Sequence, residues 1–143
     1  MRLKNYTALD TDWLRKVVAA VKPSNVTKFD ISFKNMGGSG HRGVAYTNGC
    51  SYHSNNAPLV IVALGKAKYP YKGPEGKGYL GVTVYNIKEA AVEVIAHELR
   101  HLWQAKVKKG WRVWGAKGQF SERDADAYAL RMLRAYRRGE LGC

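Results

Sequence analysis

The chain has 143 residues, of which 45% are hydrophobic and 24% charged, and its formal net charge is +13. This length and composition are typical of one globular domain, so we treat residues 1–143 as a single domain. The longest apolar run, APLVIVALG at 57–65, is far shorter than the roughly 20 residues that cross a bilayer. The sequence therefore predicts a protein without membrane spans.

The sequence also carries cues to the cellular compartment. The first residues, MRLKNYTALDTDWLRK, contain neither an apolar signal segment nor a small-residue cleavage site, so we expect no secretory signal. The two cysteines, Cys50 and Cys143, are too few for a disulfide scaffold, and no CxxC pair is present to bind zinc. These features predict a cytoplasmic protein.

A helix is expected first, over about residues 10–21. The apolar residues of 14–21 recur at helical spacing and form one stripe. Thr7 or Asp10 can cap the start of this helix, and Pro23 ends it.

Strand-like segments follow, separated by turn residues. They are VTKFDISFK (26–34), RGVAYTNGCSYH (42–53), PLVIVAL (58–64) and YLGVTVYN (79–86). The third is continuously apolar, as in a strand buried on both faces, and the last alternates between two faces. We expect turns at 35–41 and at Asn48–Gly49, and a long loop at 65–78 that is either plain surface or functional.

Two further helices are expected, over about residues 87–106 and 119–138, joined by the segment 106–118. The order of elements predicts an α+β fold. Its expected parts are an N-terminal helix, a small and mostly antiparallel twisted sheet, a helix that carries an HExxH motif and a C-terminal helix that carries glutamate.

The HExxH motif reads HELRH at residues 97–101. Residues four apart lie on the same face of a helix, so His97 and His101 can bind one metal ion together. Glu98 points about 100° around the helix from His97, which lets it reach a metal-bound water without being a ligand. The pattern therefore predicts two zinc ligands and a general base.

The apolar face of this helix supports a metal role over an ordinary core role. The apolar residues of 91–102 cluster on one arc, and the two histidines fall at its border rather than inside it. A histidine that merely packs in the core usually sits inside the apolar arc. This position is the one expected for the floor of a cleft.

Carboxylates on the last helix complete the pattern. No histidine follows His101, and the downstream carboxylates include Glu122 and Asp126, which are four apart and share one face with apolar residues. Inward carboxylates are costly unless a cation meets them. A zinc ion and the outer nitrogen of a ligand histidine would meet both.

HELRH followed by ERDAD at 122–126 resembles the gluzincins, which are zinc peptidases with HExxH and a downstream ExxxD. The resemblance covers about residues 88–137 and is closest to a minimal gluzincin or to the peptidase core of the ImmA/IrrE-like group. It implies a Zn²⁺ ion bound by His97, His101 and Glu122, with Glu98 as the catalytic base. It also implies that Asp126 orients a ligand histidine. The expected activity is that of a zinc metalloendopeptidase acting on a protein or peptide.

The resemblance also implies candidate residues that bind the substrate and its oxyanion. In that family a strand before the HExxH helix binds the substrate backbone, and GYLGVTVY at 78–85 is the candidate here. The residue that stabilises the oxyanion stays open among several candidates. They are Tyr85, Tyr69, Tyr71, His41 and His53.

The charge balance supports a second reading. The 24 Lys and Arg against 11 Asp and Glu favour anionic partners, so weak association with nucleic acid through a basic surface is expected. Trp111 and Trp114 stand among cationic residues and either stack on bases or pack under their loop. The alternative function is therefore a basic nucleic-acid-binding module with a structural or catalytically inactive zinc site.

Overall fold

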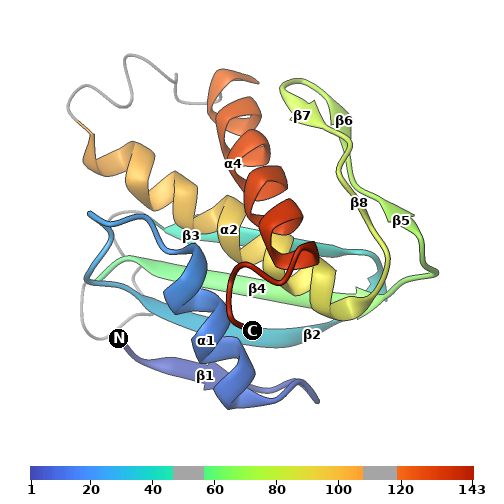
Figure 1. The fold of residues 1–143 in the computed structure, drawn as a ribbon, viewed down its shortest axis with the longest axis horizontal. Coiled ribbons are helices and arrows are strands. Elements are labelled where there is room, and N and C mark those ends of the chain that lie inside the picture. Colours follow the sequence, from blue (N-terminus) through green and yellow to red (C-terminus); the bar gives the residue numbers. More distant parts are fainter. Residues whose placement is uncertain (47–56, 108–118) are drawn as a thin grey trace.

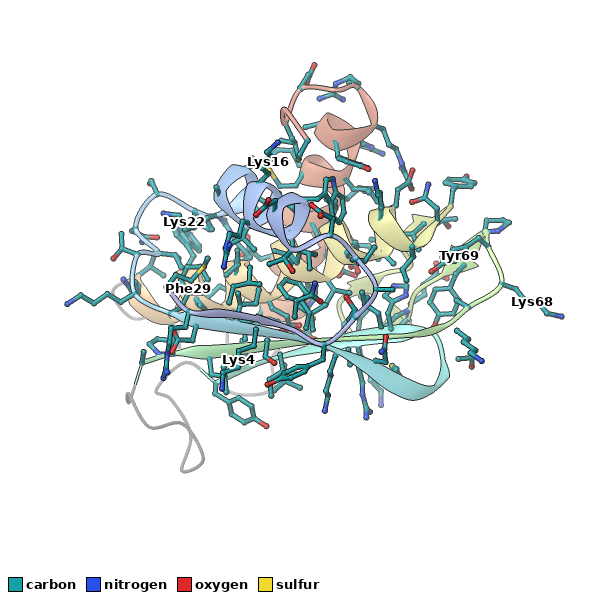
Figure 2. The ribbon with its side chains drawn as sticks, turned by 90° about the horizontal axis from the view of Figure 1, so that it is seen from below. Lys4, Lys16, Lys22, Phe29, Lys68 and Tyr69 are labelled. Atoms are coloured by element: carbon teal, nitrogen blue, oxygen red, sulfur yellow. The ribbon has the colours of Figure 1, made fainter. Side chains whose placement is uncertain are left out.

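A computed structural model describes residues 1–46, 57–107 and 119–143. A four-stranded sheet forms one layer, and all three helices lie on one side of it (Figures 1 and 2). The helices are α1 (Thr11–Val21), α2 (Ile87–Lys106) and α4 (Gln119–Arg137). This arrangement confirms the α+β class, and all three helices begin and end within about one residue of the predicted bounds.

Helix α1 has the N-terminal cap and the apolar stripe that the sequence predicts. The Asp10 side chain accepts a hydrogen bond from the Trp13 backbone N–H and so caps the helix start. Its apolar stripe is completely buried against the rest of the core. The helix ends at Val21, two residues before Pro23.

The main sheet has the strand order β1-β2-β4-β3. The strands are β1 (Leu3–Asn5), β2 (Asp30–Ser39), β3 (His41–Tyr46) and β4 (Leu59–Lys66). The β1–β2 and β2–β4 pairs are parallel, and only β3–β4 is antiparallel. The expectation of a mostly antiparallel sheet is therefore wrong for this sheet.

Two features of the chain explain the mixed sheet. Helix α1 connects β1 to β2, and such a crossover returns the chain in the same direction. Strand β4 then lies between β2 and β3 instead of at an edge, because its apolar residues are best buried in the centre of the sheet. Strand β1 itself was not expected from the sequence.

The connection from β2 to β3 is tighter than expected. Residues 35–39 belong to β2, and only Gly40, with a φ of +87°, reverses the chain before β3 begins at His41. The turn predicted over 35–41 is therefore mostly strand. The predicted Asn48–Gly49 turn lies outside the described residues.

Residues 71–84, called the arm below, contain two short antiparallel ladders. Strand β5 (Tyr71–Lys72) pairs with β8 (Thr83–Val84), and β6 (Glu75–Gly76) pairs with β7 (Tyr79–Leu80). The single strand predicted over 79–86 is wrong, because Gly81, with a φ of +70°, separates β7 from β8. The predicted loop 65–78 contributes the other half of each ladder.

Helix α2 is the centre of the fold. Its Asn86 cap accepts a hydrogen bond from the Glu89 N–H, and twelve of its residues are buried. It packs against β3 and β4 on one side and against α4 on another, and α4 lies farther from the sheet (Figure 2). The arm runs beside α4 (Figure 1). Residues of α2, β3, α4 and the arm line one pocket. Within the described ranges, no helix has the length and apolarity of a membrane span.

Candidate metal centre

The two motif histidines lie side by side, as the helical spacing predicts. His97 is buried and His101 is partly buried. Their Nε2 atoms are 3.1 Å apart, and the two rings meet edge to face. Two ring nitrogens at this distance need a positive charge or a shared proton between them. The pair therefore presents two donor atoms to one point.

Glu122 brings a third donor to the same point from α4. Its Oε1 atom lies 2.7 Å from His101 Nε2 and 3.5 Å from His97 Nε2. Ligand bonds of about 2.0–2.1 Å at tetrahedral angles place the donors of a zinc site about 3.3 Å apart. The three observed separations surround that value, so these side chains fit a zinc ion.

Asp126 fixes the proton on His97. Its Oδ1 lies 2.7 Å from His97 Nδ1, and its Oδ2 accepts the Leu80 backbone N–H at 2.9 Å. A carboxylate only accepts, so Nδ1 donates a proton to Asp126, and Nε2 is the nitrogen that can bind a metal. The predicted orienting role of Asp126 therefore has the expected geometry, and the arm contributes to it through Leu80.

Gln104 fixes the proton position on His101, as Asp126 does on His97. Its Nε2 donates to the Ser121 carbonyl and to Asp124, each at 2.9 Å, so its Oε1 faces His101 Nδ1 at 2.8 Å. His101 Nδ1 must then be the donor, so Nε2 is the nitrogen that can bind a metal once it gives up the proton that it shares with Glu122. The sequence analysis missed Gln104, although its position three residues after His101 places it on the same side of the helix.

A further ion pair holds this amide in place. Arg100 donates from Nε to Asp124 Oδ2 at 2.8 Å and from a terminal nitrogen to Oδ1 at 3.2 Å. The Arg100 guanidinium also stacks on Trp103 with 3.6 Å from its carbon to the ring centre. Asp124 therefore has a structural role that its place inside ERDAD did not indicate.

The pKa values show that this site favours positive charge. Burial alone would lower the pKa of His97, but hydrogen bonds to Asp126 and Glu122 raise it well above 6.5. Burial would raise the pKa of Glu122, yet hydrogen bonds with His101, His97 and Tyr79 lower it strongly. In the metal-free protein the histidines thus retain protons that a metal ion would displace.

Glu98 lies beside this donor set without belonging to it. Its Oε2 is 4.0 Å from His97 Nε2, and the side chain is buried. Burial raises the pKa of its carboxyl group. Gly43 of β3 makes room for it, because a Cβ at this position would stand 2.4 Å from Glu98 Cγ.

Tyr79 is the aromatic residue that the sequence analysis missed. Its ring stacks parallel to His97, with 6.1 Å between ring centres and a 7° angle between planes. Burial and a hydrogen bond with Glu122 raise its pKa well above 10. The tyrosine therefore holds Glu122 from the arm side. The alternating strand pattern of residues 79–86 does not predict this contact.

The residues expected to stabilise an oxyanion are scattered. Tyr85 is exposed beneath Arg137, and Tyr69 packs against the core. Tyr71 stacks edge to face on His41, and His41 lines a pocket beside Glu98. His53 lies outside the described residues.

Comparison of the chain with protein-family models, with curated proteins and with solved structures finds no match. The functional assignment therefore depends on the geometry of the site itself.

Proposed function

We propose that the protein is a zinc-dependent metalloendopeptidase of the minimal gluzincin kind. His97, His101 and Glu122 bind the zinc ion, and Glu98 is the catalytic base. The observation that carries the proposal is the convergence of three donor atoms at 2.7–3.5 Å, with Asp126 and Gln104 fixing both histidine tautomers. Among the described residues, no fourth histidine, cysteine or carboxylate joins this set. Such a site leaves room for water, as catalytic zinc sites do.

The chemistry divides between the ion and the protein. A bound zinc ion would polarise the scissile carbonyl group and lower the pKa of water. Glu98, with its raised pKa, accepts a proton from that water and donates it to the leaving amine. Asp126 and Gln104 keep the ligand histidines in their metal-binding tautomers while the proton moves.

The edge of the main sheet suits a peptide substrate. Within the described part of the chain, β3 pairs only with β4, which leaves its other edge open beside α2. An extended peptide can add to such an edge through backbone hydrogen bonds. Gly43, near the middle of β3, lies against Glu98. A peptide along β3 therefore extends past Glu98 in both directions, which favours cleavage of internal bonds. We accordingly propose β3, in place of residues 78–85, as the strand that binds the substrate.

Elemental analysis tests the metal assignment. Purified protein should carry about one zinc ion per chain, based on one three-ligand site. His97→Ala, His101→Ala and Glu122→Ala should each lose most of it. Glu75→Gln, an exposed substitution on the arm, is the matched control and should keep it. Undiminished zinc in His97→Ala would contradict the assignment.

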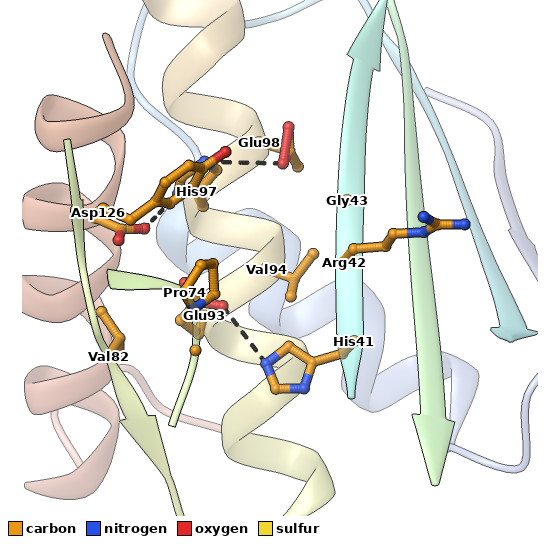
Figure 3. A pocket seen from close by; sticks show the side chains of 12 residues that line it. His41, Arg42, Gly43, Pro74, Val82, Glu93, Val94, His97, Glu98 and Asp126 are labelled. Carbon is orange, nitrogen blue, oxygen red and sulfur yellow. Dashed lines mark hydrogen bonds and ion pairs between the residues drawn. The ribbon is translucent and has the colours of Figure 1, made fainter. Parts of the chain in front are cut away.

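The outer face of the sheet favours a second candidate function. Lys34, Ala63 and Arg42 are aligned across three strands, and Lys4 pairs with Ser32, two residues before Lys34. The three cations are exposed. Arg42 points away from the pocket in Figure 3. This open, basic face suits the phosphates of a nucleic acid.

A salt series tests nucleic-acid binding. Affinity for a single-stranded oligonucleotide should fall with salt at a log–log slope near −0.7 per phosphate contact. Replacing Lys4, Lys34 and Arg42 by glutamine should reduce that slope, whereas the same replacement of Lys72 on the arm should not. Absence of binding at physiological salt would remove this candidate. Among the described residues Cys143 has no disulfide partner, which suits a reducing compartment, so we place either function in the cytoplasm.

A further inference from the structure

A pocket of about 120 Å³ extends from the metal centre along α2. Strand β3, the arm and α2 surround it, and Asp126 of α4 closes one side (Figure 3). Glu98 and His97 lie at one end, so a group bound in the pocket is next to the reacting bond. The proposed mechanism makes no use of the rest of this space.

Two polar residues of the pocket lack close partners. Glu93 is 13% exposed and His41 is 7% exposed, and His41 Nε2 lies 4.0 Å from Glu93 Oε2. Among the described residues, the ion contact given for the Glu93 carboxylate is this one at 4.0 Å, and the fully buried His41 Nδ1 atom has no hydrogen-bond partner. Because the contact with His41 is long, the Glu93 carboxylate can accept hydrogen bonds from a guest, whereas His41 Nδ1 has no accessible surface and cannot.

The pocket is built to keep both groups where they are. Tyr71 packs edge to face on His41 with 4.9 Å between ring centres. Gly40, immediately before His41, leaves room for the Tyr71 hydroxyl, because a Cβ there would stand 2.6 Å from that oxygen. Val82, Val94 and Pro74 provide apolar walls. A guest with an apolar stem and a polar end fits this arrangement.

The charges around the pocket determine which polar group a guest can carry at its end. Five of the chain's 11 carboxylates lie around the metal centre: Glu93, Glu98, Glu122, Asp124 and Asp126. Arg100 neutralises Asp124, and Glu122 and Asp126 face the ligand histidines, whereas no Lys or Arg of the described residues pairs with Glu93. Burial lowers the pKa of His41, which therefore adds no charge at neutral pH. An anionic guest is repelled, and a cationic guest is attracted.

We infer that this pocket binds a cationic side chain of the substrate, lysine or arginine, with Glu93 as its counter-charge. The inference rests on the proposed peptidase function, whose substrate preference it specifies. The long stem of such a side chain contacts the apolar walls, and its N–H groups donate to the Glu93 carboxylate. Cleavage should therefore occur next to basic residues.

Peptides of one fixed sequence, varied at a single residue near the cleaved bond, test the inference. The residue is lysine, arginine, glutamate or norleucine, which keeps the lysine stem but lacks the ammonium group. Cleavage by the zinc-loaded parent and binding to zinc-loaded Glu98→Gln are both measured, the latter by fluorescence anisotropy. Lysine should exceed norleucine roughly 10- to 100-fold in kcat/KM and in affinity, as a charged hydrogen bond provides.

Two variants test whether the preference for lysine over norleucine arises in the pocket. Glu93→Gln keeps the size of the side chain and should reduce the lysine-to-norleucine ratio at least tenfold. Glu75→Gln, an exposed carboxylate of the arm outside the pocket, should leave that ratio unchanged. A Glu93→Gln ratio equal to that of the parent would overturn the role of Glu93.

The outcomes separate this inference from the proposed function. Selective binding of lysine peptides without cleavage by the parent would support the inference and refute the peptidase. Cleavage without preference, or with preference for norleucine or glutamate, would support the peptidase and refute the inference. Absence of both binding and cleavage for every peptide would refute both.

Discussion

Asp126→Asn should flip the tautomer of His97 without changing the size of the side chain. One oxygen of Asp126 faces His97 Nδ1 at 2.7 Å, and the other accepts the Leu80 N–H at 2.9 Å. Asparagine has one oxygen and one NH₂ group, so it satisfies only one of these donors. If its oxygen faces Leu80, its NH₂ faces Nδ1, and the histidine proton moves to Nε2, where a metal cannot bind.

The expected loss of zinc affinity follows from either orientation of the substituted amide. If the amide instead turns its oxygen to His97, the Leu80 N–H is left unpaired, at a cost of about 1–3 kcal/mol. We therefore expect zinc affinity to fall about 10- to 100-fold, the range typical of residues that orient metal ligands. Competition against a chromophoric chelator at fixed pH measures it, with the exposed substitution Asp12→Asn as control. Zinc affinity within twofold of the parent would refute the reasoning.

Three other substitutions probe separate parts of the site. Gln104→Leu removes the acceptor of His101 Nδ1 and should weaken zinc binding about tenfold in the same assay; equal affinity would deny the amide its orienting role. Gly43→Ala places a Cβ against Glu98, so peptide cleavage should drop at least tenfold while zinc content stays at one per chain; full activity would show that Glu98 can shift freely. Burial raises the pKa of Glu93 to about 7, so stability falls as pH rises from about 4.5 to about 7 because the unfolded chain releases that proton first. Glu93→Gln should stabilise the metal-free protein by up to about 3 kcal/mol more at pH 8 than at pH 5 in urea unfolding, and a pH-independent effect would contradict this.

The helices and the centre of the site were predictable from local patterns. The bounds of α2 and α4 follow from apolar periodicity. His97 and His101 lie together because i and i+4 positions share a helix face, and Glu122 joins them because α4 packs on α2. The same spacing on α4 puts Asp126 on the face that contacts His97. These residues needed only the expectation that two helices pack face to face.

The remaining features depend on contacts between distant segments. Tyr79 reaches Glu122 because Gly81 breaks the predicted strand and folds the arm against α4. Gln104 gains its role only when Ser121 and Asp124 take its NH₂ group. The parallel pairing of β4 with β2 likewise depends on which strand occupies the centre of the sheet. Local periodicity does not specify such pairings.

The most direct test of the central claim is peptide hydrolysis by Glu98→Gln measured beside its zinc content. Glu98 is proposed as the base and not as a ligand, and its Oε2 lies 4.0 Å from His97 Nε2. The variant should retain about one zinc ion per chain and lose hydrolysis at least 100-fold, because an amide cannot accept the proton from water. Hydrolysis equal to that of the parent, at equal zinc content, would contradict the account.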